Sequence, residues 1–199
     1  MPHKPTGDGV AFVPRCRTMP RRTDNVTLLV EHILSERGRG ALFHVTDERN
    51  IPLIAKYGLL SKQQAEIRGV VPVYPGGDGL TRALDRNYGL WNDVFLAFHT
   101  SMIMPKQPDE RRRRPRVLRV DPRVLHLPGV KIALGCANHR GTKTYDASRA
   151  VERMDREAFV GQLDWNDFFM RGRMLRAPNY EVLVPTVVPP EYIVGIVDA

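Results

Sequence analysis

The apolar residues of this chain gather in short runs, and this feature narrows the possible folds most. None of the runs approaches the roughly 18 to 20 residues needed to span a bilayer, so we expect no membrane segment. Helical patterns separate the runs irregularly, which favours an α+β fold over a doubly wound parallel sheet. Predicted strands cover Ala41–Thr46, Asp93–Phe98, Val117–Val120, Val130–Leu134, Tyr180–Val184 and Tyr192–Val197.

Several segments have helical patterns. Asp24–Arg37 carries apolar residues at helical spacing, so it predicts an amphipathic helix that Thr23 or Asp24 can cap at its start and Gly38 can end. Asp47 can cap a second helix, and Gly58 suits the position after its last turn, where a left-handed residue is needed. Ser148–Leu163 has helical composition, and Trp165–Leu175 predicts another helix or a structured loop.

Other stretches predict loops. Val70–Tyr88 is Gly- and Pro-rich near its start and is long for a connection, which is typical of functional or mobile loops. Pro105–Pro115 is expected to be exposed. Met1–Arg22 is rich in Pro, Arg and Gly, and we expect a flexible basic leader there. The length of 199 residues then leaves 23–199 as a single catalytic or binding domain.

Charge and cysteine content limit the function classes. The chain has 30 Lys and Arg against 22 Asp and Glu, and the net charge of +8 favours anionic partners such as nucleic acid or nucleotides. Cys16 and Cys136 are too few for a disulfide framework and fit a reducing cytosol. The N-terminus has no apolar secretory signal, so a cytoplasmic location is expected.

The common motifs of nucleotide and metal enzymes are absent from the sequence. It contains no GxxxxGK[ST] loop, no GxGxxG after a strand, no HExxH and no CxxC. The six histidines are scattered without the spacing of metal ligands. We therefore expect no bound metal.

Two positions are unusual for their surroundings. His44 and Thr46 share one face of the first predicted strand, where a histidine is either a hydrogen-bonded core residue or a ligand contact. Glu181 lies within the apolar run YEVLV, and a glutamate is rarely buried without a partner. It is either an edge-strand charge facing water or a site residue, and both readings stay open.

The order of these features resembles the ADP-ribosyltransferase fold, and more narrowly the DarT-type DNA ADP-ribosyltransferase toxins. A strand with His-x-Thr precedes an asparagine and a helix that ends in Gly-Leu-Leu, and a late strand carries the glutamate. IRGVVPVYPGGDG is similar to the family's arginine before a Val-Pro-Val and Gly-rich loop, and NYEVLVPTVVPPEYI is similar to its closing stretch. The resemblance runs from about Ala41 to Val197. The residues that carry its His-x-Thr part are His44, Thr46, Asn50, Gly58, Leu59 and Leu60.

The resemblance implies a split β-sheet with flanking helices around an NAD cleft. His44, Thr46 and Asn50 would position NAD, and Glu181 would be the catalytic carboxylate. Arg68 best matches the family's arginine, which would contact the NAD diphosphate or orient the acceptor, although Arg82 and Arg86 lie in the same stretch. Leu96 occupies the position where the family usually has an aromatic residue. The nicotinamide-stacking residue therefore stays open among Phe95, Phe98 and Tyr88.

The acceptor implied by the resemblance is a nucleobase on single-stranded DNA, in a toxin with a neutralising antitoxin partner. RNA or protein acceptors, NAD-dependent removal of an RNA 2′-phosphate, and a non-catalytic basic nucleic-acid-binding module are the alternatives. Aromatic and basic residues before the glutamate strand, together with an arginine run, suit a strand-binding groove. These candidates are Arg111–Arg114, Trp165, Phe168, Phe169, Arg171, Arg173 and Arg176.

Overall fold

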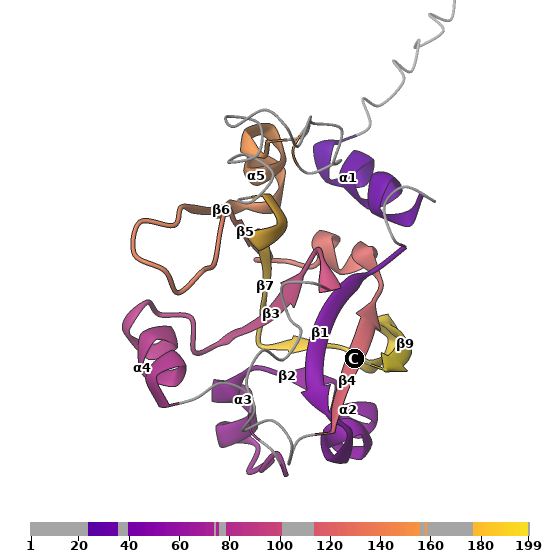
Figure 1. The fold of residues 1–199 in the computed structure, drawn as a ribbon, viewed down its shortest axis with the longest axis vertical. Helices are drawn as coiled ribbons and strands as arrows, with labels where there is room; N and C mark the ends of the chain where they lie inside the picture. The colour runs from indigo at the N-terminus through magenta and orange to yellow at the C-terminus, as the bar shows by residue number, and fades with distance from the viewer. Residues whose placement is uncertain are drawn as a thin grey trace, which may run out of the picture.

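A computed structural model describes residues 24–35, 40–73, 75, 79–100, 114–155, 158 and 177–198. Within these residues the main element is a seven-stranded sheet in the order β6-β5-β7-β3-β1-β4-β9, with every neighbouring pair antiparallel (Figure 1). The α+β fold class is therefore confirmed. The strands are β1 (Leu42–Asp47), β3 (Asp93–Ala97), β4 (Pro115–Val120), β5 (Lys131–Ala133), β6 (Thr144–Asp146), β7 (Glu181–Pro185) and β9 (Ile193–Asp198). A second, two-stranded sheet pairs β2 (Leu59–Leu60) with β8 (Val187–Val188).

The helices surround this sheet. Of the two residues that the sequence offered as a cap, Asp24 caps α1 by accepting a hydrogen bond from the Thr27 amide at 2.9 Å. The described helices are α1 (Asn25–Leu34), α2 (Ile51–Tyr57), α3 (Lys62–Ile67), α4 (Gly79–Asn87) and α5 (Ala147–Arg153), with 3-10 turns η2 (Glu48–Asn50), η5 (Pro122–His126), η6 (Ala177–Asn179) and η7 (Pro190–Tyr192). None of these helices is long and apolar enough to cross a membrane.

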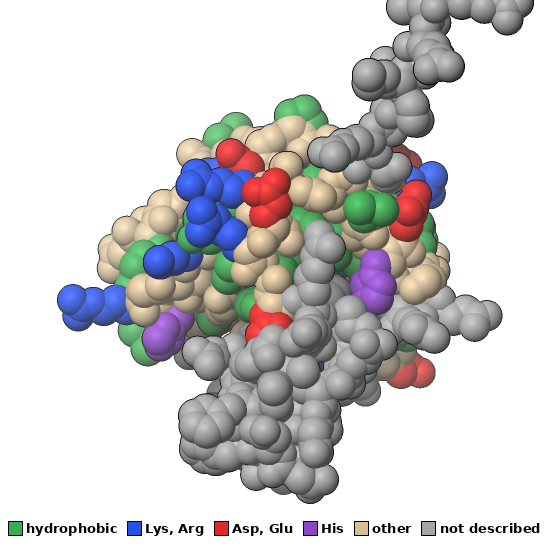
Figure 2. Space-filling view, turned by 90° about the horizontal axis from the view of Figure 1, so that it is seen from above, with side chains coloured by type: hydrophobic (Ala, Val, Ile, Leu, Met, Phe, Trp, Pro, Cys, Tyr) green, Lys and Arg blue, Asp and Glu red, His purple; other side chains and the backbone are tan. Residues whose placement is uncertain are grey.

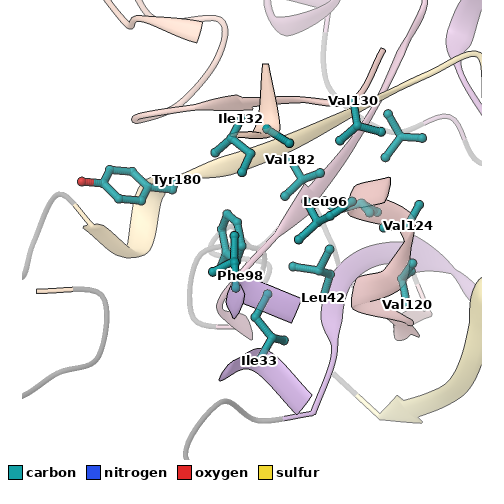
Figure 3. Close-up of a cluster of buried hydrophobic side chains, with 14 of the residues drawn as sticks. Ile33, Leu42, Leu96, Phe98, Val120, Val124, Val130, Ile132, Tyr180 and Val182 are labelled. Atoms are coloured by element: carbon teal, nitrogen blue, oxygen red, sulfur yellow. The ribbon is translucent and has the colours of Figure 1, made fainter. Parts of the chain in front are cut away.

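The main hydrophobic core lies on the sheet face that α1 and α5 cover. Alternate strand residues such as Leu42, Leu96 and Val182 point to this face and are at most 1% exposed (Figure 3). Ile33 of α1 packs on the same cluster. Burying one such side chain contributes roughly 1.5–3 kcal/mol. The core on this face therefore holds the strands in place and leaves the opposite face to smaller apolar clusters.

The sheet is split between β1 and β3. β1 pairs with β4 over its whole length, and β3 pairs with β7 from Asp93 to Ala97. Between β1 and β3, the described register consists of one pair, Phe43 opposite Ala97. The two halves of the sheet therefore diverge beyond this pair. This confirms the expected split-sheet architecture.

Some expectations about elements were wrong. The stretch Val70–Tyr88 was predicted to be loop-rich, but α4 occupies its second half. Asp85 is the buried residue of this helix, and the sequence prediction overlooked the helical spacing of Leu80, Ala83 and Leu84 after the Gly- and Pro-rich start of the stretch. Of the helix predicted over Ser148–Leu163, α5 covers the part up to Arg153, and Met154 is extended; most of residues 156–163 lie outside the described residues. The predicted loop around Pro185–Pro190 contains the short strand β8.

Several predictions lie outside the described residues. These concern the leader Met1–Arg22, most of the arginine run Arg111–Arg114, and the segment Trp165–Leu175 with its neighbour Arg176. Arg114 itself is described, and its amide binds the Asp47 carboxylate at 3.0 Å.

Gly58 links α2 to β2, and its substitution gives a first prediction. Its φ of 79° and ψ of −179° fall in a region that is essentially restricted to glycine, and an added Cβ would lie 2.5 Å from the Val188 carbonyl oxygen. We expect Gly58→Ala to lower the free energy of unfolding by more than about 2 kcal/mol in denaturant titrations. Gly89→Ala is the matched control, because Gly89 has a φ of 70° but open space around it. Equal losses for the two variants would contradict the close approach to Val188.

Candidate functional site

A pocket of about 670 Å³ lies where the sheet splits, between β1, β3 and the helices α2, α3 and α4. This volume is within the range of small-molecule sites. Three of the residues predicted to position NAD line it, namely His44, Thr46 and Asn50. The structure therefore brings these three side chains together at one pocket, as the sequence predicted, but three polar side chains do not by themselves identify a ligand.

His44 is held at the split by a backbone carbonyl. Its Nδ1 lies 2.9 Å from the Phe95 carbonyl oxygen. Because a carbonyl only accepts, Nδ1 carries the proton and donates. Burial lowers the pKa of His44, the Lys62 cation lowers it further, and the carbonyl opposes them in part. The imidazole is therefore neutral at pH 7, and its Nε2 is an acceptor suited to a ligand hydroxyl.

Thr46 and Asn50 stand on a rigid corner. The Asn50 side-chain amide lies 3.4 Å from the Thr46 hydroxyl, and Asn50 is 6% exposed at the start of α2. Between them, Asp47 accepts hydrogen bonds from the Arg49 amide and guanidinium and from the Arg114 amide. These bonds hold the pKa of Asp47 well below its usual range. Asp47 therefore serves to fix the corner that presents its neighbours.

Cations line the other side of the pocket. The Lys62 ammonium lies 2.7 Å from the Asp85 carboxylate and 5.2 Å from the centre of the Phe95 ring. Arg82 and Arg86 of α4 also line the pocket, and Arg86 stacks on Trp91 at 3.8 Å while pairing with Glu66. Arg68, the arginine chosen from the sequence, is exposed at the end of α3 and does not line this pocket.

The aromatic candidates separate clearly. Phe95 lines the pocket, whereas Phe98 is buried in the main core and Tyr88 is exposed at the end of α4. Trp91 also lines the pocket, and sequence reasoning missed it together with Lys62. Neither residue carries a local signal: Lys62 is the first residue of α3, and Trp91 lies in the turn between α4 and β3.

Glu181 lies on an interior strand and is partly buried. β7 runs between β3 and β5, so the edge-strand reading of this residue is excluded. Its cross-strand neighbours are Ala97 and Ala133, whose small side chains leave space beside the carboxylate. Its Oε2 accepts a hydrogen bond from the Ala137 amide at 2.7 Å. Burial raises the pKa of Glu181, the Asp85 charge adds to this rise, and the Ala137 amide opposes it.

Glu181 does not line the pocket itself, but a short series of contacts connects the two. Lys62 of the pocket wall pairs with Asp85, and Asp85 accepts a hydrogen bond from the Asn138 side chain at 3.1 Å. Asn138 follows Ala137, whose amide binds Glu181. Among the described residues, no group of three or more His, Cys, Asp or Glu side chains could hold a metal ion. The arrangement thus offers a carboxylate, cations and hydrogen-bonding groups for chemistry at this site.

The bond between His44 and Phe95 predicts a difference between two substitutions. An asparagine amide can stand near the position of Nδ1 and donate to the same carbonyl, whereas leucine leaves that carbonyl without a donor. We expect His44→Leu to lower the free energy of unfolding by about 1–3 kcal/mol and His44→Asn to lower it by less than about 1 kcal/mol. Chemical denaturation of both variants measures this. Equal losses would show that the carbonyl does not depend on the imidazole.

The raised pKa of Glu181 predicts a pH-dependent effect of Glu181→Gln. Because the fold favours the protonated acid, the wild-type protein loses stability as the pH rises from near the ordinary value of 4.5 through the raised pKa of the folded state. The glutamine variant has no such loss. We therefore expect its melting temperature relative to wild type to rise between about pH 4 and pH 7. A difference that stays constant over this range would contradict a raised pKa.

Comparisons with known proteins bear on the fold. No protein-family model and no curated protein matches the chain. Among solved structures, Thermosipho africanus DarTG in complex with ADP-ribose superposes with a TM-score of 0.56 and 21% identity over 80% of this chain and 44% of that one. This chain thus spans less than half of that protein.

Thermus sp. 2.9 DarT is a second similar structure, with 16% identity over 78% of this chain and 79% of that one. The TM-score is 0.51 for its complex with ADP-ribosylated single-stranded DNA and 0.50 for its complex with NAD⁺. The split sheet of this chain therefore has the fold of these DarT structures.

Proposed function

We propose that this protein is an NAD-dependent ADP-ribosyltransferase that modifies a nucleobase on single-stranded DNA. The observation that carries the proposal is the pocket at the split of the sheet, where His44, Thr46 and Asn50 meet and which contacts through Asp85 connect to Glu181. The similar Thermus protein forms complexes with NAD⁺ and with ADP-ribosylated single-stranded DNA, which supports both the donor and the acceptor.

The residues of the pocket fit a dinucleotide. NAD carries ribose hydroxyls, a diphosphate and two rings. His44 Nε2, Thr46 and Asn50 offer hydrogen bonds to hydroxyls, and Arg82 and Arg86 offer positive charge to phosphates. Phe95 and Trp91 offer aromatic surfaces at the same pocket. Arg68 keeps its predicted role toward the diphosphate or the acceptor as a proposal, and Arg82 and Arg86 are its competitors because they line the pocket.

Glu181 supplies the electrostatic part of the mechanism. Bound NAD contributes a ribose–nicotinamide bond whose cleavage leaves positive charge on the ribose. A fixed carboxylate stabilises such a developing charge, and one preorganised group of this kind contributes about 3–4 kcal/mol. The ionised form of Glu181 can also accept a proton from the attacking base. The reaction needs no metal, because the leaving group already carries positive charge.

The surface charge suits a nucleic-acid acceptor. Figure 2 looks onto the end of the molecule that carries α1 and α5, and Lys and Arg side chains gather toward one side of it. Exposed basic residues in this part of the chain are Arg140, Lys143, Arg149 and Arg153. A base on a single strand reaches a pocket without the free energy needed to open a duplex. Single-stranded DNA is therefore the acceptor that we propose. We also propose that the protein is located in the cytoplasm.

A toxin role follows from the same likeness. Modification of DNA bases would block copying of the strand, so a cell that makes such an enzyme needs a neutralising partner. We propose an antitoxin that removes the modification or binds the enzyme. The similar Thermosipho protein, described as DarTG, supports this proposal by its name alone.

Glu181→Gln tests the catalytic assignment. We expect release of nicotinamide and transfer of label from NAD to single-stranded DNA to fall by about 100- to 1,000-fold, because the neutral amide cannot balance the ribose charge. Glu31→Gln on the exposed side of α1 makes the same change far from the pocket and should keep wild-type rates. Near-wild-type turnover in Glu181→Gln would exclude this role for the carboxylate.

The same assay with other acceptors tests the substrate class. Label transferred to DNA supports the proposal. Label found only on RNA or protein, or removal of an RNA 2′-phosphate, would move the activity to another acceptor on the same fold. Nucleic-acid binding without any turnover of NAD would indicate a non-catalytic module.

A further inference from the structure

A tight turn fixes the position of the Glu181 carboxylate. The turn Cys136–His139 is closed by a hydrogen bond from the His139 amide to the Cys136 carbonyl at 3.0 Å. Its second residue, Ala137, is 7% exposed and donates its amide to Glu181 Oε2 at 2.7 Å. The place of this turn therefore decides where that oxygen lies.

The Asn138 side chain clamps this turn from two sides. Its Nδ2 donates to Asp85 Oδ1 at 3.1 Å, and its Oδ1 accepts from the Cys136 thiol at 3.1 Å. The first of these bonds attaches the turn to α4, a helix that lies 53 residues earlier in the chain. The second joins two positions within the turn. Without the Asn138 side chain, both of these bonds would be lost and the Ala137 amide would be less constrained.

Asp85 is the group to which the turn is attached. Its side chain is 2% exposed, and its second oxygen lies 2.7 Å from the Lys62 ammonium. Lys62 in turn lines the pocket and stands over the rings of Phe95 and Trp91 at 5.2 and 5.6 Å. One buried carboxylate therefore contacts both the pocket wall and the turn that holds Glu181.

We propose that Asp85 and Asn138 are positioning residues that fix the Glu181 carboxylate relative to the Lys62 side of the pocket. This inference rests on the proposed function, since it assigns a working orientation to the proposed catalytic group. Asn138 acts through the turn, and Asp85 acts through both Asn138 and Lys62. Neither residue is expected to contact the reacting atoms.

The charges around the turn change the pKa of Glu181, which makes the arrangement measurable. The Asp85 charge adds to burial in raising the pKa of Glu181, while the Ala137 amide lowers it. The Cys136 thiol faces both carboxylates, and burial together with Glu181 and Asp85 raises its pKa. Lys62 offsets the Asp85 charge from the pocket side. His139, also on the turn, is exposed. Removal of the Asp85 charge should therefore lower the pKa of Glu181.

Asn138→Ala tests the mechanical half of the proposal in the full chain. We expect kcat for nicotinamide release to fall by about 10- to 100-fold, because a small misplacement of a catalytic group has effects of this size. The KM for NAD should stay within about twofold, because the contact between Lys62 and Asp85 remains. Asn25→Ala on α1 removes an exposed amide that bonds Glu152 and should leave both constants unchanged. An unchanged kcat in Asn138→Ala would overturn the proposal.

Asp85→Asn tests the electrostatic half. Its amide oxygen can still accept from Asn138, but its charge is lost. The KM for NAD should rise as Lys62 loses its partner, and the acid limb of the kcat profile should move to lower pH. Titration of the Glu181 side-chain carboxyl by ¹³C NMR gives the same shift without any turnover. If wild type releases no nicotinamide, the proposed function fails, while the NMR titration still decides whether Asp85 acts on Glu181. An unmoved Glu181 titration would overturn the proposal in either case.

Discussion

The opening between β1 and β3 is the constraint on which the site depends. Antiparallel neighbours normally exchange hydrogen bonds along their length, and closing these two strands would remove the space between the halves of the sheet. Here the described register stops after Phe43 and Ala97, and the His44 ring donates to the Phe95 carbonyl instead of a strand amide. A side chain thus satisfies a carbonyl that the split would otherwise leave without a donor. The other ring nitrogen of His44 is left as an acceptor, and His44 lines the pocket, so the residue that bridges the split also contributes a polar group to the pocket.

Sequence patterns predicted the parts of this structure that local chemistry determines. Asp24 caps α1, Gly58 ends α2 in a conformation that only glycine adopts readily, and the strand with His44 and Thr46 lies where alternation placed it. The resemblance of His44, Thr46 and Asn50 to a known pattern added that these residues belong together, and the pocket brings them together. Local rules work here because caps, turns and alternation depend on near neighbours.

Residues that act through long-range packing could not be predicted in this way. Asp85 lies on a helix that the sequence did not predict, and its partners Lys62 and Asn138 are 23 and 53 residues away in the sequence. Arg68 was chosen because it precedes Val-Pro-Val, yet α3 leaves it exposed while α4 brings Arg82 and Arg86 to the pocket. The sequence offered three arginines in one stretch, and only the course of the helices separates them.

Asp47 and Glu181 are both at least partly buried, but their hydrogen-bond donors and the directions of their pKa shifts differ. Asp47 receives two backbone amides and a guanidinium, and these donors lower its pKa, so its charge is fully compensated and the corner before α2 is rigid. Glu181 receives one backbone amide, lies near the Asp85 charge, and has a raised pKa; within the described part of the chain no cation pairs with it. A carboxylate left in this state is destabilised when ionised at neutral pH. Positive charge that develops beside it therefore gains more stabilisation than it would beside a carboxylate like Asp47, whose charge is already neutralised by the fold.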